Sequence, residues 1–120
     1  MNWPIWNAET LYALVGNDVP MQSRMLNLFL REAEKQIPVI ERAVAAGELA
    51  SVADLAHVLK TSARMVGALK MGLLCEEIET TGDARESASC FASVQLLAAV
   101  FSTTELKIRT QMAVPTAAFK

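Results

Sequence analysis

A long run of apolar residues repeats at helical spacing, and it constrains the fold more than any other feature. The run recurs every three or four residues over about six turns: Leu26, Phe29, Leu30, Ala33, Ile37, Ile40 and Val44. A stripe of this period is typical of the buried face of an amphipathic helix. Asp18 as cap and Pro20 in the first turn predict its start, and Gly47 predicts its end. Pro38 predicts a kink rather than a break.

Similar patterns predict four more helices. The first runs from Asn7 to Val15 and is ended by Gly16, and the next starts between Glu48 and Ser51 and ends around Gly67. The last two run from about Leu69 to Thr81 and from about Ala84 to Met112. Ser51 with Asp54 resembles a capping box. Gly82 and Asp83 are expected to form the stop and the next cap. The side chains expected to face inward from the last two helices are Leu73, Leu74, Cys75, Ile78, Phe91, Val94, Leu97, Ala98, Phe101 and Ile108.

Short connections between long amphipathic helices favour antiparallel neighbours. The expected fold is therefore all-α, an antiparallel up-down four-helix bundle with a short extra N-terminal helix. The 120 residues form one domain, with an N-terminal segment and lid helix at 1–17, the bundle at 18–112 and a loose tail at 113–120. Trp3, Ile5 and Trp6 are expected to pack over one end of the bundle.

Composition excludes several classes of function. A formal net charge of −2 argues against a nucleic-acid partner, which needs a basic face. Two cysteines are too few for a disulfide scaffold. We find no run approaching the ~20 apolar residues that span a bilayer, and the opening MNWPIW lacks the basic residues of a signal peptide. We therefore expect a cytoplasmic domain without membrane contact.

The third helix carries the only histidine of the chain, and its apolar stripe is Leu55, Leu59, Ser62, Ala63 and Val66. His57 projects roughly 200° away from its neighbours in that stripe, with Lys60, Thr61 and Arg64 on its own side. An imidazole in water titrates at about pH 6.5, so it offers a nucleophilic ring nitrogen near neutrality. Lys60 could pair with a phosphoryl group on that nitrogen. The alternative is an ordinary surface histidine beside a lysine.

Three short motifs stand in register around this histidine, and they read His57-x-Leu59-Lys60-x-Ser62-Ala63, Gly67-Ala68 and Leu74-Cys75-x-x-Ile78-Glu79. They resemble the signature of histidine-containing phosphotransfer (HPt) domains of multistep phosphorelays, which usually read HxLKGSA, GA and LCxxLE. Thr61 departs from this pattern, because the family usually has glycine there. Its branched side chain either narrows the approach to the imidazole or folds back onto the carbonyl of His57.

The resemblance implies a role for each site residue. His57 would accept a phosphoryl group from a receiver-domain aspartate, through Nε2, and pass it to another receiver. Lys60 and Arg64 would stabilise the phosphoryl oxygens. Glu79 would orient the imidazole by accepting a hydrogen bond from Nδ1–H, although it could equally be a solvated residue at a helix end.

The remaining residues of the site contact the partner or shape the packing. Asp54, Thr61 and Arg64 are expected to face the receiver domain, while Gly67 and Ala68 allow close packing between the third and fourth helices. The partners implied are response-regulator receiver domains, with a hybrid sensor kinase as a further candidate, and the chain is expected to be a monomer.

The implied protein is a phosphocarrier rather than an enzyme. In HPt–receiver pairs the receiver supplies Mg²⁺, so no cofactor is expected in this chain. No metal site is expected either, because one histidine with scattered carboxylates is a poor ligand set. A glycine-rich phosphate loop of the GxxxxGK[ST] kind is missing from the sequence, which argues against ATP-dependent kinase activity in this segment. The segment could still belong to a hybrid sensor kinase polypeptide.

Two alternatives stay open. The phosphoacceptor domain of chemotaxis-type histidine kinases has a related motif, but takes its phosphate from ATP through a kinase domain. That family tends to carry a second histidine where this chain has Cys75, which favours the phosphorelay. The other alternative is a helical adaptor that binds a partner without being phosphorylated.

Overall fold

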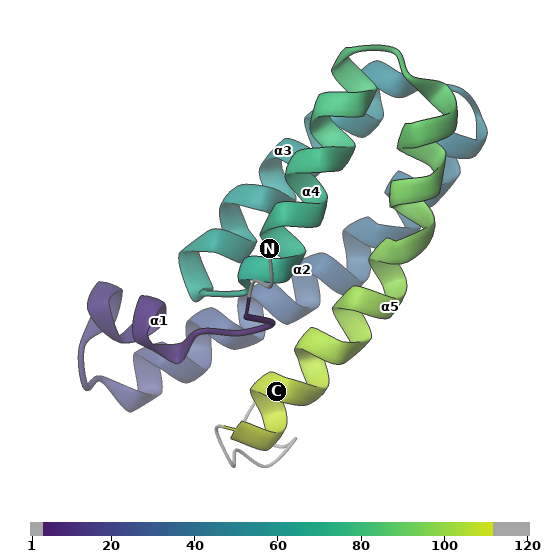
Figure 1. Ribbon diagram of the computed structural model, residues 1–120. Helices are drawn as coiled ribbons and strands as arrows, with labels where there is room; N and C mark the ends of the chain where they lie inside the picture. The colour runs from purple at the N-terminus through teal and green to yellow at the C-terminus, as the bar shows by residue number, and fades with distance from the viewer. Residues whose placement is uncertain (1–3, 112–120) are drawn as a thin grey trace.

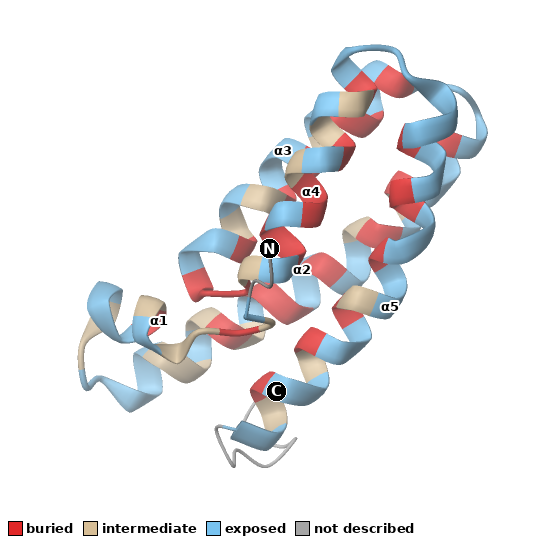
Figure 2. Ribbon diagram, in the orientation of Figure 1, coloured by how far each residue is buried: buried red, intermediate tan, exposed pale blue. Residues whose placement is uncertain are grey.

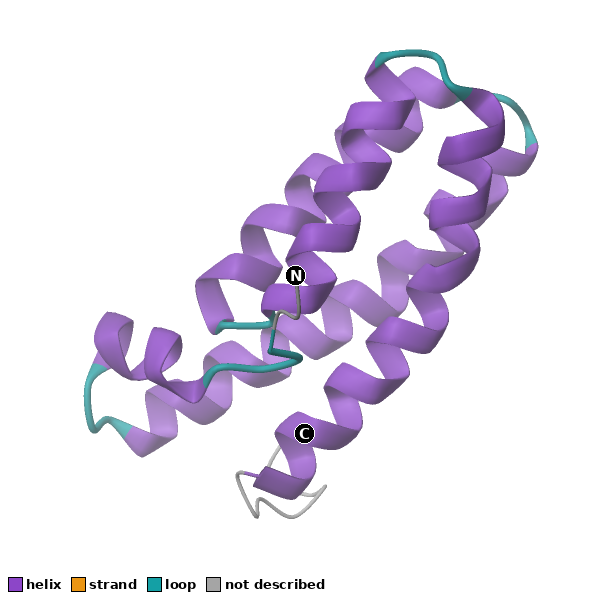
Figure 3. Cartoon of the chain, viewed as in Figure 1, coloured by secondary structure: helices purple, strands orange, loops and turns teal. Residues whose placement is uncertain are grey.

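A computed structural model describes residues 4–111 and contains five helices in that part of the chain. They are α1 (Ala8–Val15), α2 (Val19–Ala45), α3 (Leu49–Val66), α4 (Leu69–Asp83) and α5 (Ser87–Gln111). Helices joined by short loops account for the described residues, with no strand among them (Figure 3). The all-α prediction is confirmed. The expected positions of Trp3, Met112 and the tail 113–120 lie outside the described residues.

The four long helices form one bundle, and α1 lies at one end of it (Figure 1). α3 packs against α2 and α4, and α5 packs against the same two helices, which closes a ring. α1 contacts α2 and α3. Buried residues gather on the inward faces of the long helices (Figure 2). The middle of the core consists of fully buried side chains, among them Leu26, Ile40, Val52, Leu59, Met71, Ile78, Leu97 and Ile108.

The first two helices begin where the sequence predicts. The side chain of Asn7 accepts a hydrogen bond from the backbone N–H of Glu9 at 3.0 Å. That of Asp18 accepts from the N–H of Met21 at 3.1 Å. These bonds satisfy backbone donors that the first turn of a helix leaves unpaired. α2 continues through Pro38, and every residue of its predicted stripe is buried.

The third helix begins and ends where the sequence predicts, but its predicted cap and the predicted end of the fourth helix need correction. α3 begins at Leu49 without a side-chain cap, so Ser51 lies inside its first turn and the capping box is wrong. α4 ends at Asp83, so Gly82 lies inside the helix and does not stop it, and α5 begins at Ser87 rather than at about Ala84, so Asp83 does not cap it as predicted. Gly82 is buried against the start of α3, where a Cβ would lie 3.1 Å from the carbonyl oxygen of Leu49. The glycine therefore permits a close helix contact rather than ending the helix.

Some predicted core positions are also wrong. Leu73 and Phe91 are 40% and 43% exposed, and Ala98 is exposed. Ser62 is only partly buried, and so is Leu55, although Leu55 still packs against the core. The true stripe of α5 is Cys90, Ser93, Val94, Leu97, Phe101, Thr104 and Ile108. The predicted positions Val94, Leu97, Phe101 and Ile108 are confirmed, whereas Phe91 and Ala98 each lie one position, about 100° around the helix, from a buried residue.

The described segment before α1 ties the bundle together at the α3–α4 connection. We call residues 4–7 the N-terminal strap. The indole Nε1 of Trp6 donates to the carbonyl of Val66 at 2.8 Å, and Trp6 is buried. The backbone N–H of Asn7 donates to the carbonyl of Gly67 at 2.8 Å, and that of Lys70 donates to Pro4 at 3.1 Å. The predicted packing of Trp6 over one end of the bundle is thus confirmed.

The prediction that no segment is apolar enough to span a bilayer needs correction for α5. Among the described residues it is long and apolar enough to cross a membrane, judged by length and composition alone. Core helices of soluble proteins meet the same condition, and α5 packs its buried stripe against α2 and α4. We therefore treat α5 as a core helix of the bundle.

Candidate functional site

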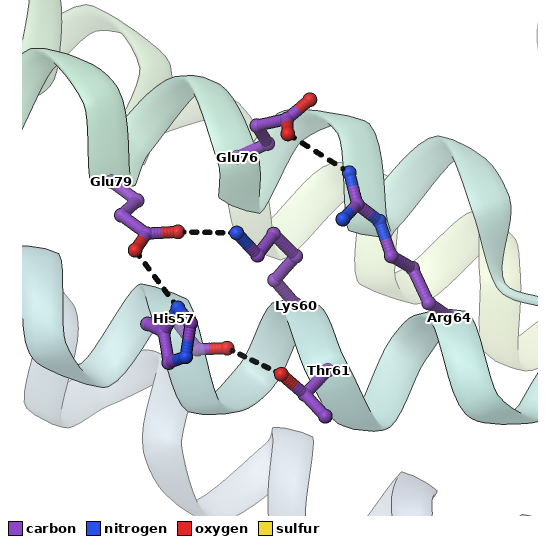
Figure 4. Close-up of polar contacts among 6 residues, drawn as sticks. All are labelled: His57, Lys60, Thr61, Arg64, Glu76 and Glu79. Atoms are coloured by element: carbon purple, nitrogen blue, oxygen red, sulfur yellow. Dashed lines mark hydrogen bonds and ion pairs between the residues drawn. The ribbon is translucent and has the colours of Figure 1, made fainter.

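His57 lies on the outward face of α3, midway along the helix. Its side chain is 59% exposed, whereas its neighbours Ala56 and Leu59 are buried in the core. The core side of α3 therefore fixes the helix while the imidazole stays accessible. Figure 4 shows the ring between α3, which carries it, and a carboxylate that reaches across from α4.

That carboxylate belongs to Glu79 and binds two partners at once. Its Oε2 lies 2.8 Å from Nδ1 of His57, and its Oε1 accepts from Nζ of Lys60 at 2.6 Å. The Lys60 ammonium is the main reason that the pKa of Glu79 falls below its ordinary value, and the hydrogen bond with His57 lowers it further. Glu79 is therefore ionised near neutral pH.

An ionised carboxylate can only accept hydrogen bonds, so Nδ1 of His57 must carry the proton in their contact. In a neutral imidazole the lone pair then resides on Nε2. The ring thus offers a nucleophilic nitrogen on the side away from Glu79. The contact implied by the resemblance is present, and nothing in the sequence alone indicated that Lys60 would share the same carboxylate.

The two cations near His57 have different surroundings. The Lys60 side chain is only 15% exposed and is turned toward Glu79. Arg64 is 46% exposed, and its Nη2 lies 3.1 Å from Oε1 of Glu76 on α4. Glu76 was not among the predicted site residues. The available signal was its spacing, because residues three apart on a helix share a face, and Glu76 and Glu79 both face α3.

The residues expected to face a receiver are all on the surface. Thr61 is exposed, and its hydroxyl donates to the carbonyl of His57 at 3.1 Å, which is the folded-back conformation considered for this side chain. Asp54 is exposed one turn before His57. It lines a groove between the end of α2 and the start of α3, together with Arg42 and Leu55.

Gly67 and Ala68 are both buried between α3 and α4. A Cβ on Gly67 would collide with the carbonyl oxygen of Asn7. The close approach at this glycine is therefore made by the N-terminal strap rather than by α4. Contact between α3 and α4 depends instead on Gly72, where a Cβ would lie 3.1 Å from Cγ of Arg64, and on Gly82.

Exposed apolar side chains are found on α3 and on its neighbour α2. Val58, the residue after His57, is 58% exposed, and Leu28 of α2 is 57% exposed. Leu28 lines a groove between α2 and α3 with Met25 and Met65. A groove lined by exposed apolar residues favours contact with another protein.

Metal and thiol chemistry find no support here. Among residues 4–111, no group of three or more histidine, cysteine or acidic side chains could hold a metal ion. Cys75 lies beneath the site, and burial raises the pKa of its thiol to about 12. A thiol that stays protonated is neither a nucleophile nor a metal ligand.

Comparison with known proteins gives one match. The family model described as "Hpt domain" matches residues 24–108, which include His57 and all four long helices except the first residues of α2 and the last residues of α5. Neither the curated proteins nor the solved structures gave a match.

Proposed function

This chain belongs to the Hpt domain family, and we propose that His57 accepts a phosphoryl group from a receiver-domain aspartate and passes it to a second receiver. Hpt domains act in two-component phosphorelays, where they interact with response-regulator receiver domains. The observation that carries the assignment to His57 is its exposed ring, with Nδ1 held by Glu79 and Nε2 directed away from that contact.

The transfer would use few groups of this chain. Nε2 attacks the phosphorus atom, the bond from phosphorus to the aspartate oxygen breaks, and the aspartate leaves as a carboxylate. Nδ1 keeps its proton and donates it in a hydrogen bond to Glu79, which stabilises the positive charge of the phosphorylated imidazole ring. Phosphoryl transfer depends mainly on positioning and charge stabilisation. Lys60 and Arg64 would offset negative charge at the site, and the receiver would supply Mg²⁺.

The receiver would dock over the surface around His57. We propose Asp54, Thr61 and Arg64 as polar contacts, since all three are exposed on α3. The apolar groove between α2 and α3 would receive apolar side chains of the partner, because it is lined by the same helix that carries His57 and by exposed Leu28 and Met65. An apolar centre with polar residues around it is common in protein interfaces.

We also propose the finer architecture expected from the sequence, an antiparallel up-down four-helix bundle with α1 as a lid. Connections of two or three residues between consecutive long helices support it. The pairing of helix ends also supports it. Gly82, late in α4, lies against Ala53, early in α3, whereas Arg64, late in α3, lies near Gly72, early in α4. The proposed domain division is 1–17, 18–112 and 113–120.

We propose a cytoplasmic phosphocarrier that is a monomer, has no cofactor of its own and binds no nucleic acid. Hpt domains are typically soluble and cytoplasmic, and the net charge of −2 supports the last point. A phosphocarrier of this kind can stand alone or form part of a hybrid sensor kinase.

A labelling experiment tests the function. A radiolabelled phosphoreceiver should label the wild-type chain with an acid-labile phosphoryl group and should leave His57→Gln unlabelled. Full labelling of the variant, or an acid-stable product, would reject the proposal. Incubation with a chemotaxis-type kinase core and ATP separates the nearest alternative, since efficient labelling there, without labelling by any phosphoreceiver, would favour a kinase phosphoacceptor domain. A wild-type chain that takes label from neither donor would favour the adaptor.

A further inference from the structure

The most unusual feature of the site is that its lysine is paired with the same carboxylate as its histidine. Lys60 Nζ lies 2.6 Å from Glu79 Oε1, and His57 Nδ1 lies 2.8 Å from Glu79 Oε2. The Lys60 side chain is 15% exposed and the His57 side chain 59% exposed. The ammonium is therefore covered and aimed at Glu79, while the imidazole remains open to a partner.

Glu79 brings a cost along with its benefit. The carboxylate fixes the proton on Nδ1. It also places a negative charge beside the imidazole ring, which must receive a negatively charged phosphoryl group. Like charges at short range repel, and the repulsion grows where water is partly excluded. A docked receiver would exclude water from this surface. A cation bound directly to Glu79 removes most of the repulsion and keeps the carboxylate in place.

We propose that Lys60 promotes transfer through Glu79, as a positioning residue that neutralises this carboxylate and holds it on His57 Nδ1, rather than as the direct ligand of the phosphoryl group. This inference rests on the proposed function of His57. Arg64 is the better candidate for the phosphoryl oxygens, because its ion pair with Glu76 is about half exposed on both sides. Exposed ion pairs of this kind are weak and are easily exchanged.

The two possible roles of Lys60 predict opposite results in a double-variant experiment. If Lys60 acts through Glu79, the loss of the lysine matters only while residue 79 carries a negative charge. Gln at position 79 retains a side-chain oxygen that accepts from Nδ1–H and needs no counter-charge. The harm done by Lys60→Met should then be suppressed by Glu79→Gln. If Lys60 binds the phosphoryl group directly, the two substitutions should add or worsen one another.

The experiment measures the rate of phosphoryl transfer from one radiolabelled receiver to the full chain. We expect Lys60→Met to slow transfer about tenfold or more, and the Lys60→Met, Glu79→Gln double variant to return to within about threefold of Glu79→Gln alone. Glu76→Gln is the matched control, because it also neutralises a carboxylate of α4 that is ion-paired with α3. Combined with Lys60→Met, it should give no recovery.

The proton on the imidazole gives a second readout that needs no receiver. By ¹⁵N NMR above pH 8, the wild type should show the Nδ1–H tautomer, and Lys60→Met, in which no cation holds the Glu79 carboxylate on Nδ1, should show a mixture of tautomers. The inference is overturned if Lys60→Met transfers as fast as the wild type, if the double variant is no faster than Lys60→Met, or if the tautomer is unchanged in Lys60→Met.

Failure of the proposed function would look different, because then the wild type itself would take no label while the NMR comparison still reports on Lys60. Should Lys60→Met prove too unstable for rate measurements, the free energy of unfolding replaces the rate. The double variant should then regain stability that the Glu76→Gln combination does not. Equal instability of the two double variants would overturn the inference.

Discussion

Substituting Gly67 by alanine should destabilise the fold far more than the same change at another left-handed glycine. Gly67 has φ 89°, and Gly47 has φ 75°. A non-glycine residue in this conformation costs about 1–2 kcal/mol at either position. At Gly47 a new Cβ meets nothing within 4 Å, so this strain is the whole effect. At Gly67 it would also collide with the carbonyl oxygen of Asn7.

Relief of that collision requires the N-terminal strap to move. Its hydrogen bonds from Asn7 N to Gly67 O and from Trp6 Nε1 to Val66 O, both 2.8 Å long, would then be lost. Each buried bond contributes about 1 kcal/mol. Partial exposure of the Trp6 indole, now 4% exposed, would cost a further 1 kcal/mol or more, by about 25 cal/mol per Å² of apolar surface. Gly67→Ala should therefore lose about 4–5 kcal/mol.

Urea unfolding monitored by circular dichroism measures both variants under the same conditions. The account predicts that Gly67→Ala loses about 3 kcal/mol more than Gly47→Ala. Losses that agree within about 1 kcal/mol would show that the N-terminal strap yields freely and does not support the α3–α4 connection.

Three further predictions concern the site. Because the pKa of Glu79 lies below its ordinary value of 4.5, the carboxylate stabilises the fold fully above pH 4.5, and this stabilisation is lost as the pH falls through the lowered pKa. Urea unfolding at pH values from about 6 to about 2 should thus show a smaller loss of unfolding free energy in Glu79→Gln than in the wild type. An equal dependence of the unfolding free energy on pH in both proteins would refute the assignment. Iodoacetamide should leave Cys75 unmodified in the native chain at about pH 8 and alkylate it in urea, because burial keeps the thiol protonated; rapid native alkylation found by mass spectrometry would contradict this. Thr61→Gly should change the rate of phosphoryl transfer less than about threefold, because the Thr61 hydroxyl is already hydrogen-bonded to the carbonyl of His57 and turned away from the ring. It should lower the free energy of unfolding by about 0.5 kcal/mol, because glycine is the poorer helix former. Transfer accelerated about tenfold would show that Thr61 obstructs the imidazole.

Periodicity predicted the helices well where the pattern was long and clearly amphipathic. The stripe of α2 is buried at every predicted position. Six turns with apolar residues on one side and polar residues on the other leave only one face of the helix that can be buried. α5 is apolar on several sides, so its pattern did not distinguish Phe91 from Cys90. The exposed face of such a helix is decided by its neighbours and not by its own composition.

The glycines that end helices were predictable from the sequence, whereas the glycines that permit close contacts were not. Gly16 ends α1 as expected, but Gly82 lies inside α4 because the carbonyl of Leu49 approaches it. Gly67 is left-handed at the end of α3, and its missing side chain makes room for Asn7. Both contacts join segments distant in the sequence, and a local pattern carries no information about such contacts.

The candidate site divides in the same way. The exposure of His57 follows from its angular position on one helix, so the sequence was sufficient to predict it. The contact with Glu79 crosses from α3 to α4 and was expected only from the HPt resemblance. The pairing of Lys60 with Glu79 and of Arg64 with Glu76 depends on the register between two helices. Neither pairing could be obtained from spacing within either helix.

The most direct test of the whole account is a two-step relay followed through the phosphorylated chain. The chain is labelled by one phosphoreceiver, purified and examined by ¹H–¹⁵N–³¹P NMR, and then mixed with a second, unlabelled receiver. The account predicts a single phosphoryl group on Nε2 of His57, with the proton still on Nδ1, that disappears as the second receiver becomes labelled. A phosphoryl group on any other residue, or one that the second receiver cannot remove, would contradict it.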